Sequence, residues 1–306
     1  MKACIAALAI SPLATRVAAW GATGHEAVGY VAMAFLAPNA LDFVQTSLGS
    51  DYNKSLGVAG PWADQIKSND AYDWASELHY VDAQDDPPSS CSVDMDRDCA
   101  NGKCILTAIA NYTSRVVDDS LTEDEQQEAL KFLDHFIGDL GQPLHVENKE
   151  LGGNYIDVEC NGKSTNLHSL WDSGIINVLL DGKDAEDWAA DLTKRIQSGA
   201  YASLADDWIT CADPTDPLRR RGLSLRDDIW TFLESRAITP LKCPLEWAED
   251  ANSYDCSAVF TYEDGDDLCE GAYYDDAVET VELQVAKQGY RLAAWLNVLF
   301  DGETNL

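Results

Sequence analysis

Apolar residues recur at three- and four-residue spacing along most of the chain, which is the pattern of helices with one buried face. The spacing predicts helices at Gly24 to Leu36, Pro38 to Leu48, Ala108 to Val117, Glu123 to Leu140, Leu167 to Leu180, Asp184 to Ser198, Leu223 to Arg236 and Ala277 to Phe300. Thr122 is a suitable N-cap for the fourth, because Glu123, Asp124 and Glu125 place acidic side chains in its first turn.

Only one stretch resembles a β-hairpin: Asn154 to Cys160, which ends at Asn161-Gly162. No Pro/Gly/Ser linker or low-complexity tract divides the chain, so we expect one domain over about residues 20 to 306. The pattern therefore predicts a mainly α fold: a single-domain helical bundle with long loops, a small β-hairpin and disulfide staples.

The first nineteen residues have the three parts of a secretory signal peptide. Lys2 supplies positive charge, Ala3 to Leu13 are mostly apolar, and Val17-Ala18-Ala19 is a small-residue cleavage site. We expect residues 1–19 to be removed and the mature protein to begin at Trp20; the alternative is an unprocessed amphipathic N-terminus. No later run of about 18 apolar residues follows, so we expect no membrane anchor.

The cysteines agree with export. Of nine, Cys4 leaves with the signal peptide, and the remaining eight allow up to four disulfides. Cys99 and Cys104 enclose a small loop and are the best candidates for a local pair. Two sequons, Asn53-Lys54-Ser55 and Asn111-Tyr112-Thr113, suit a secreted, extracellular glycoprotein, although either can arise by chance.

The chain is strongly acidic, with a net charge of −32 that becomes −34 when Lys2 and Arg16 are removed. Proteins that bind duplex nucleic acid normally have a basic face, and the only cluster here is Arg219-Arg220-Arg221, which we interpret as a solvated loop. If the substrate is a polyanion, metal ions must supply positive charge at the site.

Histidines provide the strongest chemical signal. His135 and Asp139, like His168 and Asp172, are four residues apart and therefore share a helix face. His145 follows soon after the first pair. Further upstream come His25, Asp64 and His79. Five histidines and three aspartates are too many for one tetrahedral zinc ion, so we expect two or three ions; the alternative is a set of ordinary core or surface histidines.

Six motifs carry a resemblance to a known family. They are Trp20-Gly21-x-x-Gly24-His25, Trp62-Ala63-Asp64-x-x-Lys67, Leu78-His79-Tyr80-Val81-Asp82, His135-x-x-x-Asp139-x-x-Gln142-Pro143-Leu144-His145, Gly152-Gly153-Asn154 and Thr165-Asn166-Leu167-His168-x-x-Trp171-Asp172. In this order they resemble the zinc-dependent, single-strand-specific S1/P1-type nucleases of fungi, plants and protozoa, which are distantly related to bacterial zinc phospholipase C. The resemblance covers residues 20 to about 180.

The resemblance implies three zinc ions (Zn²⁺). The first would be held by Asp64, His79, His135 and Asp139, and the second by the Trp20 α-amine and carbonyl, His25 and a bridging Asp139. The third would be held by His145, His168 and Asp172. Signal removal would complete the second site, because a free amine is a good zinc donor and an amide nitrogen is a poor one.

The implied reaction is hydrolysis of single-stranded DNA and RNA to 5′-phosphorylated products, and also of 3′-nucleotides, by a metal-activated water. Asp64 would orient that water, and Lys67 would offset charge at Asp64 or on the phosphate. Tyr80 would stack on an unpaired base whose edge Asp82 and Asn154 would bind. Tyr80 departs mildly from the family, which often has phenylalanine here. We also expect a mildly acidic optimum and a monomer.

Three alternatives remain at this stage. A zinc phospholipase C shares the ligand order, but its final ligand resembles glutamate where this chain has Asp172. A 3′-nucleotidase without activity on polymers would use the same site, and an extracellular zinc-binding protein would hold the metal structurally. The resemblance also suggests that Cys91 pairs with a distant cysteine, perhaps Cys243.

Overall fold

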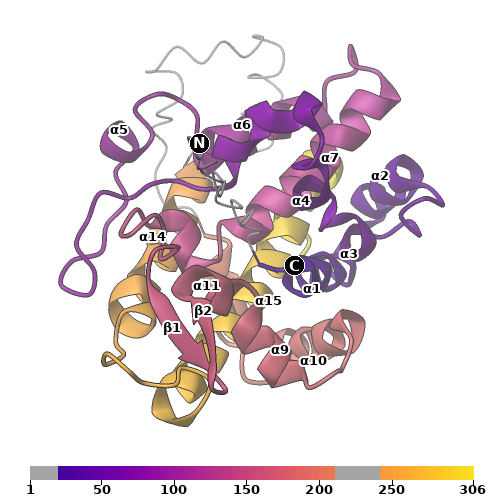
Figure 1. Ribbon diagram of the computed structural model, residues 1–306. Helices are drawn as coiled ribbons and strands as arrows, with labels where there is room; N and C mark the ends of the chain where they lie inside the picture. Colours follow the sequence, from indigo (N-terminus) through magenta and orange to yellow (C-terminus); the bar gives the residue numbers. More distant parts are fainter. Residues whose placement is uncertain (1–19, 211–241) are drawn as a thin grey trace, which may run out of the picture.

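Helices pack around the long C-terminal helix α15, Gly271–Asp301, in the computed structural model, which describes residues 20–210 and 242–306. Helix α15 lies in the middle of the molecule and contacts α1, α2, α7, α9 and α10 (Figure 1). The longer helices are α1 (Ala22–Met33), α2 (Pro38–Leu48), α6 (Ile105–Val116), α7 (Glu123–Asp139), α10 (Ala185–Ser198) and α14 (Lys242–Tyr254). The predicted mainly α fold is confirmed.

Short elements connect these helices. They are α3 (Leu56–Ala59), α4 (Trp62–Ile66), α5 (Met95–Asp98), α8 (Leu167–Ser169), α9 (Ile175–Leu180) and α11 (Ala205–Trp208), the 3-10 helices η1 (Asp70–His79) and η2 (Pro143–Val146), and the π-helical turns η3 (Leu170–Gly174) and η4 (Asp255–Val259). No helix in the described ranges has both the length and the apolarity needed to cross a bilayer.

Most predicted helices lie within a few residues of their observed bounds. Thr122 forms a capping box with Glu125: Thr122 Oγ1 accepts from the Glu125 N–H, and Glu125 Oε2 accepts from the Thr122 N–H. The helix predicted at Leu167 to Leu180 is instead divided into α8, η3 and α9. The helix predicted at Leu223 to Arg236 and the triplet Arg219-Arg220-Arg221 lie outside the described residues, as does the predicted signal peptide.

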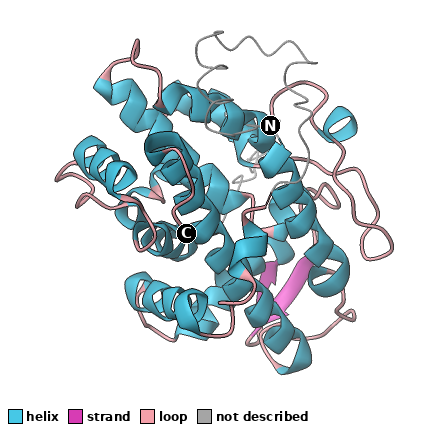
Figure 2. Cartoon of the chain, turned by 180° about the vertical axis from the view of Figure 1, so that it is seen from behind, coloured by secondary structure: helices cyan, strands magenta, loops and turns pink. Residues whose placement is uncertain are grey.

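The hairpin pairs β1, Asp157–Cys160, with β2, Lys163–Asn166, in antiparallel register at the edge of the helical body (Figure 2). Asn161 and Gly162 connect the strands with φ of 52° and 69°, the left-handed conformation that an Asn-Gly hairpin turn requires. Their N–H groups donate to the Asp267 carboxylate at 2.9 and 2.7 Å. The predicted hairpin is confirmed, with the first strand shorter than expected.

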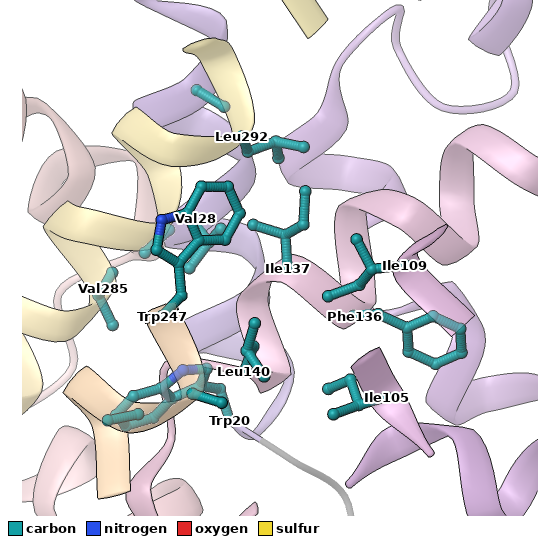
Figure 3. Packing of buried hydrophobic residues seen from close by; sticks show 14 of the residues in the cluster. Trp20, Val28, Ile105, Ile109, Phe136, Ile137, Leu140, Trp247, Val285 and Leu292 are labelled. Atoms are coloured by element: carbon teal, nitrogen blue, oxygen red, sulfur yellow. The ribbon is translucent and has the colours of Figure 1, made fainter. Parts of the chain in front are cut away.

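The core lies where α7 crosses between α1, α6 and α15. Figure 3 shows Phe136 and Ile137 of α7, and Leu140 just after its end, among buried side chains from these helices; Trp247 of α14 and Trp20 complete the cluster. Because α7 is buried along its whole C-terminal half, polar side chains on that half are held rigidly inside the protein. This burial fixes the positions of His135 and Asp139.

Three disulfides join described residues: Cys91–Cys256, Cys99–Cys104 and Cys160–Cys269. The predicted local pair Cys99–Cys104 is confirmed. The suggested pair Cys91–Cys243 is wrong, because Cys91 bonds to Cys256 in η4. Cys243 lies near the opposite end of α14, roughly 20 Å away along a helix of this length, and takes part in a disulfide of its own.

Buried carboxyl groups lie next to the Cys91–Cys256 disulfide. Asn252 Nδ2 donates to Asp85 Oδ2 at 3.0 Å and lies 3.4 Å from Asp255 Oδ2. Burial, followed by the negative charges of Glu147 and Asp85, raises the pKa of Asp255 well above its ordinary value. Burial likewise raises the pKa of Glu147 to about 8. These groups therefore retain protons in the folded protein at a pH where they would lose them in the unfolded chain.

We expect the contribution of Asp255 and Glu147 to the unfolding temperature to decrease as pH rises from about 4 to about 8. A carboxyl whose pKa is raised by folding stabilises the fold fully below its unfolded pKa of about 4, and this contribution is lost as pH rises through the folded value. Asp255→Asn removes one such ionisable group, so it should raise the unfolding temperature at pH 8 by roughly 3 °C or more.

Thermal unfolding measured from pH 4 to pH 8 tests this prediction. The exposed Asp264→Asn variant is the control and should follow the wild type at every pH. Parallel curves for Asp255→Asn and wild type would show that Asp255 does not contribute to the pH dependence.

Candidate metal centre

Helix α7 presents His135 and Asp139 on one buried face, as the four-residue spacing predicts. His135 Nε2 lies 3.3 Å from Asp139 Oδ2. Gly138 lies between them, where a Cβ atom would approach His25 Nδ1 of α1 to 2.9 Å. The absence of a side chain at Gly138 therefore allows His25 to reach the α7 pair.

His25, His135 and Asp139 form the first candidate group. The rings of His25 and His135 stack with centroids 3.7 Å apart, and His25 Nε2 lies 3.0 Å from Asp139 Oδ1. The other carboxylate oxygen, Oδ2, lies 2.9 Å from His79 Nδ1. Asp139 thus uses its two oxygens on two sides, which is the arrangement that a bridging carboxylate requires.

Asp64, His79 and His135 form the second candidate group. Asp64 comes from α4 and His79 ends η1, and Asp64 Oδ1 lies 3.9 Å from His79 Nδ1 and 3.5 Å from His135 Nε2. Lys67 Nζ lies 2.6 Å from the same Asp64 oxygen, and both side chains are largely buried. His135 belongs to the first and second groups, so the two groups are contiguous.

His145, His168 and Asp172 form the third candidate group. His168 Nε2 lies 3.3 Å and His145 Nε2 4.0 Å from the Asp172 carboxylate. The π-helical turn η3 carries Asp172, and such wide turns occur often at functional sites. Gln142 Nε2 donates to Asp172 Oδ1 at 2.6 Å. Gln142 was not among the predicted site residues, although its place between Asp139 and His145 was a signal.

Backbone carbonyls orient three of the histidine rings. The Nδ1 atoms of His135, His145 and His168 lie 2.6–2.7 Å from the carbonyl oxygens of Gly60, His79 and Gly152. Each Nδ1 therefore donates to a carbonyl oxygen, which turns the Nε2 atom of the ring inward. The three Nε2 atoms are buried and have no well-aligned hydrogen-bond partner among the described residues. Buried, unsatisfied nitrogens beside carboxylates fit a metal ion.

Burial and charge act differently on these histidines. Burial lowers the pKa of His79 to about 3, and burial together with His145 lowers the pKa of His168 to about 3. Burial also opposes protonation of His135, but the carboxylates of Asp139 and Asp64 outweigh it and raise its pKa to about 10. A positive charge at the centre of the first two groups is thus strongly favoured, whether a proton or a metal ion supplies it.

Trp20 is completely buried beside these groups. The N–H of Gly21, the next residue, donates to the Asp172 carbonyl at 2.7 Å, which ties the start of α1 to η3. A Cβ atom on Gly24 would approach Trp20 Cβ to 2.8 Å, so the tryptophan packs closely on the first turn of α1. Trp20 is therefore fixed inside the molecule, at the point where the mature chain is predicted to begin.

A cavity of about 370 Å³ opens beside the second and third groups, with His79, His145 and His168 in its wall. The predicted substrate-binding residues Tyr80, Asp82 and Asn154 also line it, as does Lys67. The backbone of Tyr80 is held between two elements: its carbonyl accepts from the Ile105 N–H, and the next residue, Val81, donates to the His145 carbonyl. The structure thus brings all four predicted non-ligand site residues into one cavity.

Four further cavity residues were not predicted: Asp73, Ser76, Glu147 and Leu151. In the 3-10 helix η1, side chains three residues apart are eclipsed, so Asp73 and Ser76 lie in line with His79. Their spacing from His79 was the signal that could have identified them. Three converging His/Asp groups that could each hold a metal ion lie beside this cavity, an arrangement typical of the metal-dependent class of hydrolases.

Comparison with known proteins identifies the family. Residues 20–301 match the S1/P1 Nuclease family model. The chain is 40% identical to Nuclease P1 of Penicillium citrinum over 292 residues, which cover 93% of this chain and 99% of that protein. It is 41% identical to Nuclease S1 of Aspergillus oryzae over 287 residues, 92% of this chain and 91% of that protein. The chain belongs to the S1/P1 nuclease family.

A plant relative is more distant: Endonuclease 3 of Arabidopsis thaliana is 28% identical over 310 residues, 99% of this chain and 96% of that protein. The match to the family extends over both described parts of the chain, including α14 and α15. The protein is therefore a nuclease, and its three buried His/Asp groups fit a trinuclear metal site.

Proposed function

We propose that the protein is a zinc-dependent endonuclease that hydrolyses single-stranded DNA and RNA to 5′-phosphorylated products and also acts as a 3′-nucleotidase. The observation that carries this proposal is the position of the cavity, which shares three histidines with the second and third His/Asp groups. A base held in the cavity would place its own phosphate next to those groups. A paired base could not enter without leaving its helix.

Zinc suits the donor set, because imidazole nitrogens and carboxylate oxygens are its usual ligands. His25, Asp139 and the Trp20 terminus would hold one ion; Asp64, His79, His135 and Asp139 a second; His145, His168 and Asp172 a third. Bound zinc would supply positive charge for the phosphate and make water a nucleophile near neutral pH. The outer partners Gln142 and the three backbone carbonyls would keep the ligands aligned.

Two side chains would act on the reacting groups directly. Asp64 would accept a hydrogen bond from the attacking water and so turn the lone pair of that water toward phosphorus. The Asp64 carboxylate suits this role because its Oδ1 atom lies 2.6 Å from Lys67 Nζ and 3.9 Å from His79 Nδ1. Lys67 would move from its ion pair with Asp64 toward the phosphate and donate to a non-bridging oxygen. Both roles require the partial exposure that these two side chains retain.

Three residues would select the base. Tyr80 is 37% exposed within the cavity wall, enough to present its ring face for stacking. Burial, with the charges of Asp98 and Glu77, raises the pKa of Asp82, which suits a carboxyl that binds a base edge. Asn154 Nδ2 donates to the Leu151 carbonyl at 2.7 Å, which leaves its amide oxygen to accept from a base.

We further propose that the mature protein is a secreted, monomeric glycoprotein beginning at Trp20. The family match begins at the same residue. Three disulfides between described residues suit an oxidising compartment, and both sequon residues, Asn53 and Asn111, are exposed. Acidic surroundings would relieve repulsion between the 53 carboxylates and a polyanionic substrate, which supports a mildly acidic optimum.

A panel of four substrates tests the proposed activity. We expect the zinc-loaded protein to linearise circular single-stranded DNA, to leave the matched duplex largely intact and to release phosphate from 3′-AMP. Hydrolysis of 3′-AMP alone would indicate a nucleotidase without polymer activity. Hydrolysis of short-chain phosphatidylcholine in preference to DNA would contradict the proposal and support the phospholipase alternative.

A further inference from the structure

Large apolar side chains are rarely exposed among the described residues, and most of those that are lie near the cavity. The exposed ones are Trp74, Tyr80, Leu151, Tyr155, Leu204 and Leu306. Tyr80 and Leu151 line the cavity itself. Trp74 and Tyr155 directly follow the cavity residues Asp73 and Asn154, in η1 and in the loop before β1. Such a concentration of exposed rings indicates a binding surface.

Trp74 is held firmly although it is 52% exposed. Its Nε1 donates to the Ala71 carbonyl at 2.9 Å, and its ring packs 5.8 Å from Phe132 and 6.0 Å from Tyr72. Asp73, one residue earlier, lines the cavity, so Trp74 lies on the adjacent face of the 3-10 helix. The indole is thus an ordered, half-exposed apolar surface on the residue next to Asp73, with its only polar atom already hydrogen-bonded.

Tyr155 is 73% exposed and directly follows the cavity residue Asn154. Its N–H donates to the Glu150 carbonyl at 3.1 Å, and the Asn154 N–H donates to the Leu151 carbonyl at 3.2 Å. These bonds fold residues 150–155 into consecutive turns that fix the base of the tyrosine. Its largely exposed side chain therefore stands on an ordered turn, next to the cavity residue Asn154.

We propose that Trp74 and Tyr155 are stacking subsites for the nucleotides on either side of the base that occupies the cavity. The proposal rests on the proposed single-strand activity and explains how a polymer gains affinity on an acidic protein. The neighbouring charges Asp73, Glu77 and Glu150 cannot attract a phosphate backbone, whereas stacking on a ring needs no positive charge. A mononucleotide would be too short to reach either ring.

Kinetics on substrates of increasing length test this proposal. Trp74→Ala and Tyr155→Ala should each raise KM for a thymidine octanucleotide by about fivefold or more, the lower end of the effect of losing one base–aromatic stack. The kcat for the octanucleotide and both constants for 3′-AMP should stay at wild-type values. Trp74→Phe and Tyr155→Phe should retain most octanucleotide affinity, because phenylalanine also stacks.

Leu204→Ala is the matched control, because it removes an exposed apolar side chain that lies far along the sequence from η1 and from the loop before β1. An unchanged KM for the octanucleotide in both alanine variants would overturn the subsites. An equal rise in KM for 3′-AMP would also overturn them, because it would place the rings in the central site. Failure of the wild type to cleave single-stranded DNA would instead refute the proposed function. Thermal unfolding of Trp74→Ala and Trp74→Phe separates a packing defect from a binding defect.

Discussion

Replacing His135 by alanine should abolish hydrolysis of both single-stranded DNA and 3′-AMP. His135 is the one histidine in two of the three candidate groups, so its loss removes a donor from one group and the stacked partner of His25 from the other. We expect kcat/KM to fall by more than the roughly 10–100-fold that accompanies loss of an outer partner of a metal ligand.

The measurement is kcat/KM together with the metal content of the purified variant. Asp124→Ala, on the exposed first turn of the same helix, is the control and should keep full activity. His135→Ala should also lose bound metal, because the carboxylates of Asp64 and Asp139 would face each other across a vacant position. An active variant with wild-type metal content would refute the assignment of His135.

A protein that keeps Ala19 in front of Trp20 should bind one metal ion fewer and lose most of its activity. Trp20 is buried and its neighbour Gly21 is bonded to Asp172, so the residue cannot move aside to expose a different donor. An amide nitrogen in place of the free amine would therefore leave His25 and Asp139 with an incomplete ligand set. Loss of a ligand should lower kcat/KM by at least the roughly 10–100-fold that accompanies loss of an outer partner of a metal ligand.

Comparison of three preparations measures this effect: protein beginning at Trp20, protein beginning at Ala19, and protein beginning at Trp20 with one alanine added after Leu306. The C-terminal addition controls for chain length, because Leu306 is exposed. Equal metal content and equal activity in all three would show that the new terminus is not a ligand. The precursor would then need no cleavage to become active.

Local pattern was enough to predict much of the site. The pairs His135/Asp139 and His168/Asp172 each lie within one helical stretch, where four-residue spacing alone brings the side chains together. The Thr122 capping box and the Asn161-Gly162 turn are equally local. Convergence of Asp64 and His79 on the α7 pair depends on tertiary packing, and only the family resemblance pointed to it.

The features that sequence reasoning missed are those set by packing between distant segments. Gln142 bonds to Asp172 thirty residues later, and the carbonyls of Gly60 and Gly152 orient rings in other elements. Backbone acceptors leave no trace in residue type. Helix α14 was overlooked, and with it the position of Cys256, which is why Cys91 was assigned the wrong partner. Neither error affects the residues of the three groups.

Metal content of the protein that begins at Trp20 tests the central claim most directly. Elemental analysis after extensive dialysis should find three zinc ions per chain, one for each His/Asp group, and full activity should return only when all three are restored after chelation. One zinc ion or none in a fully active protein would contradict the account.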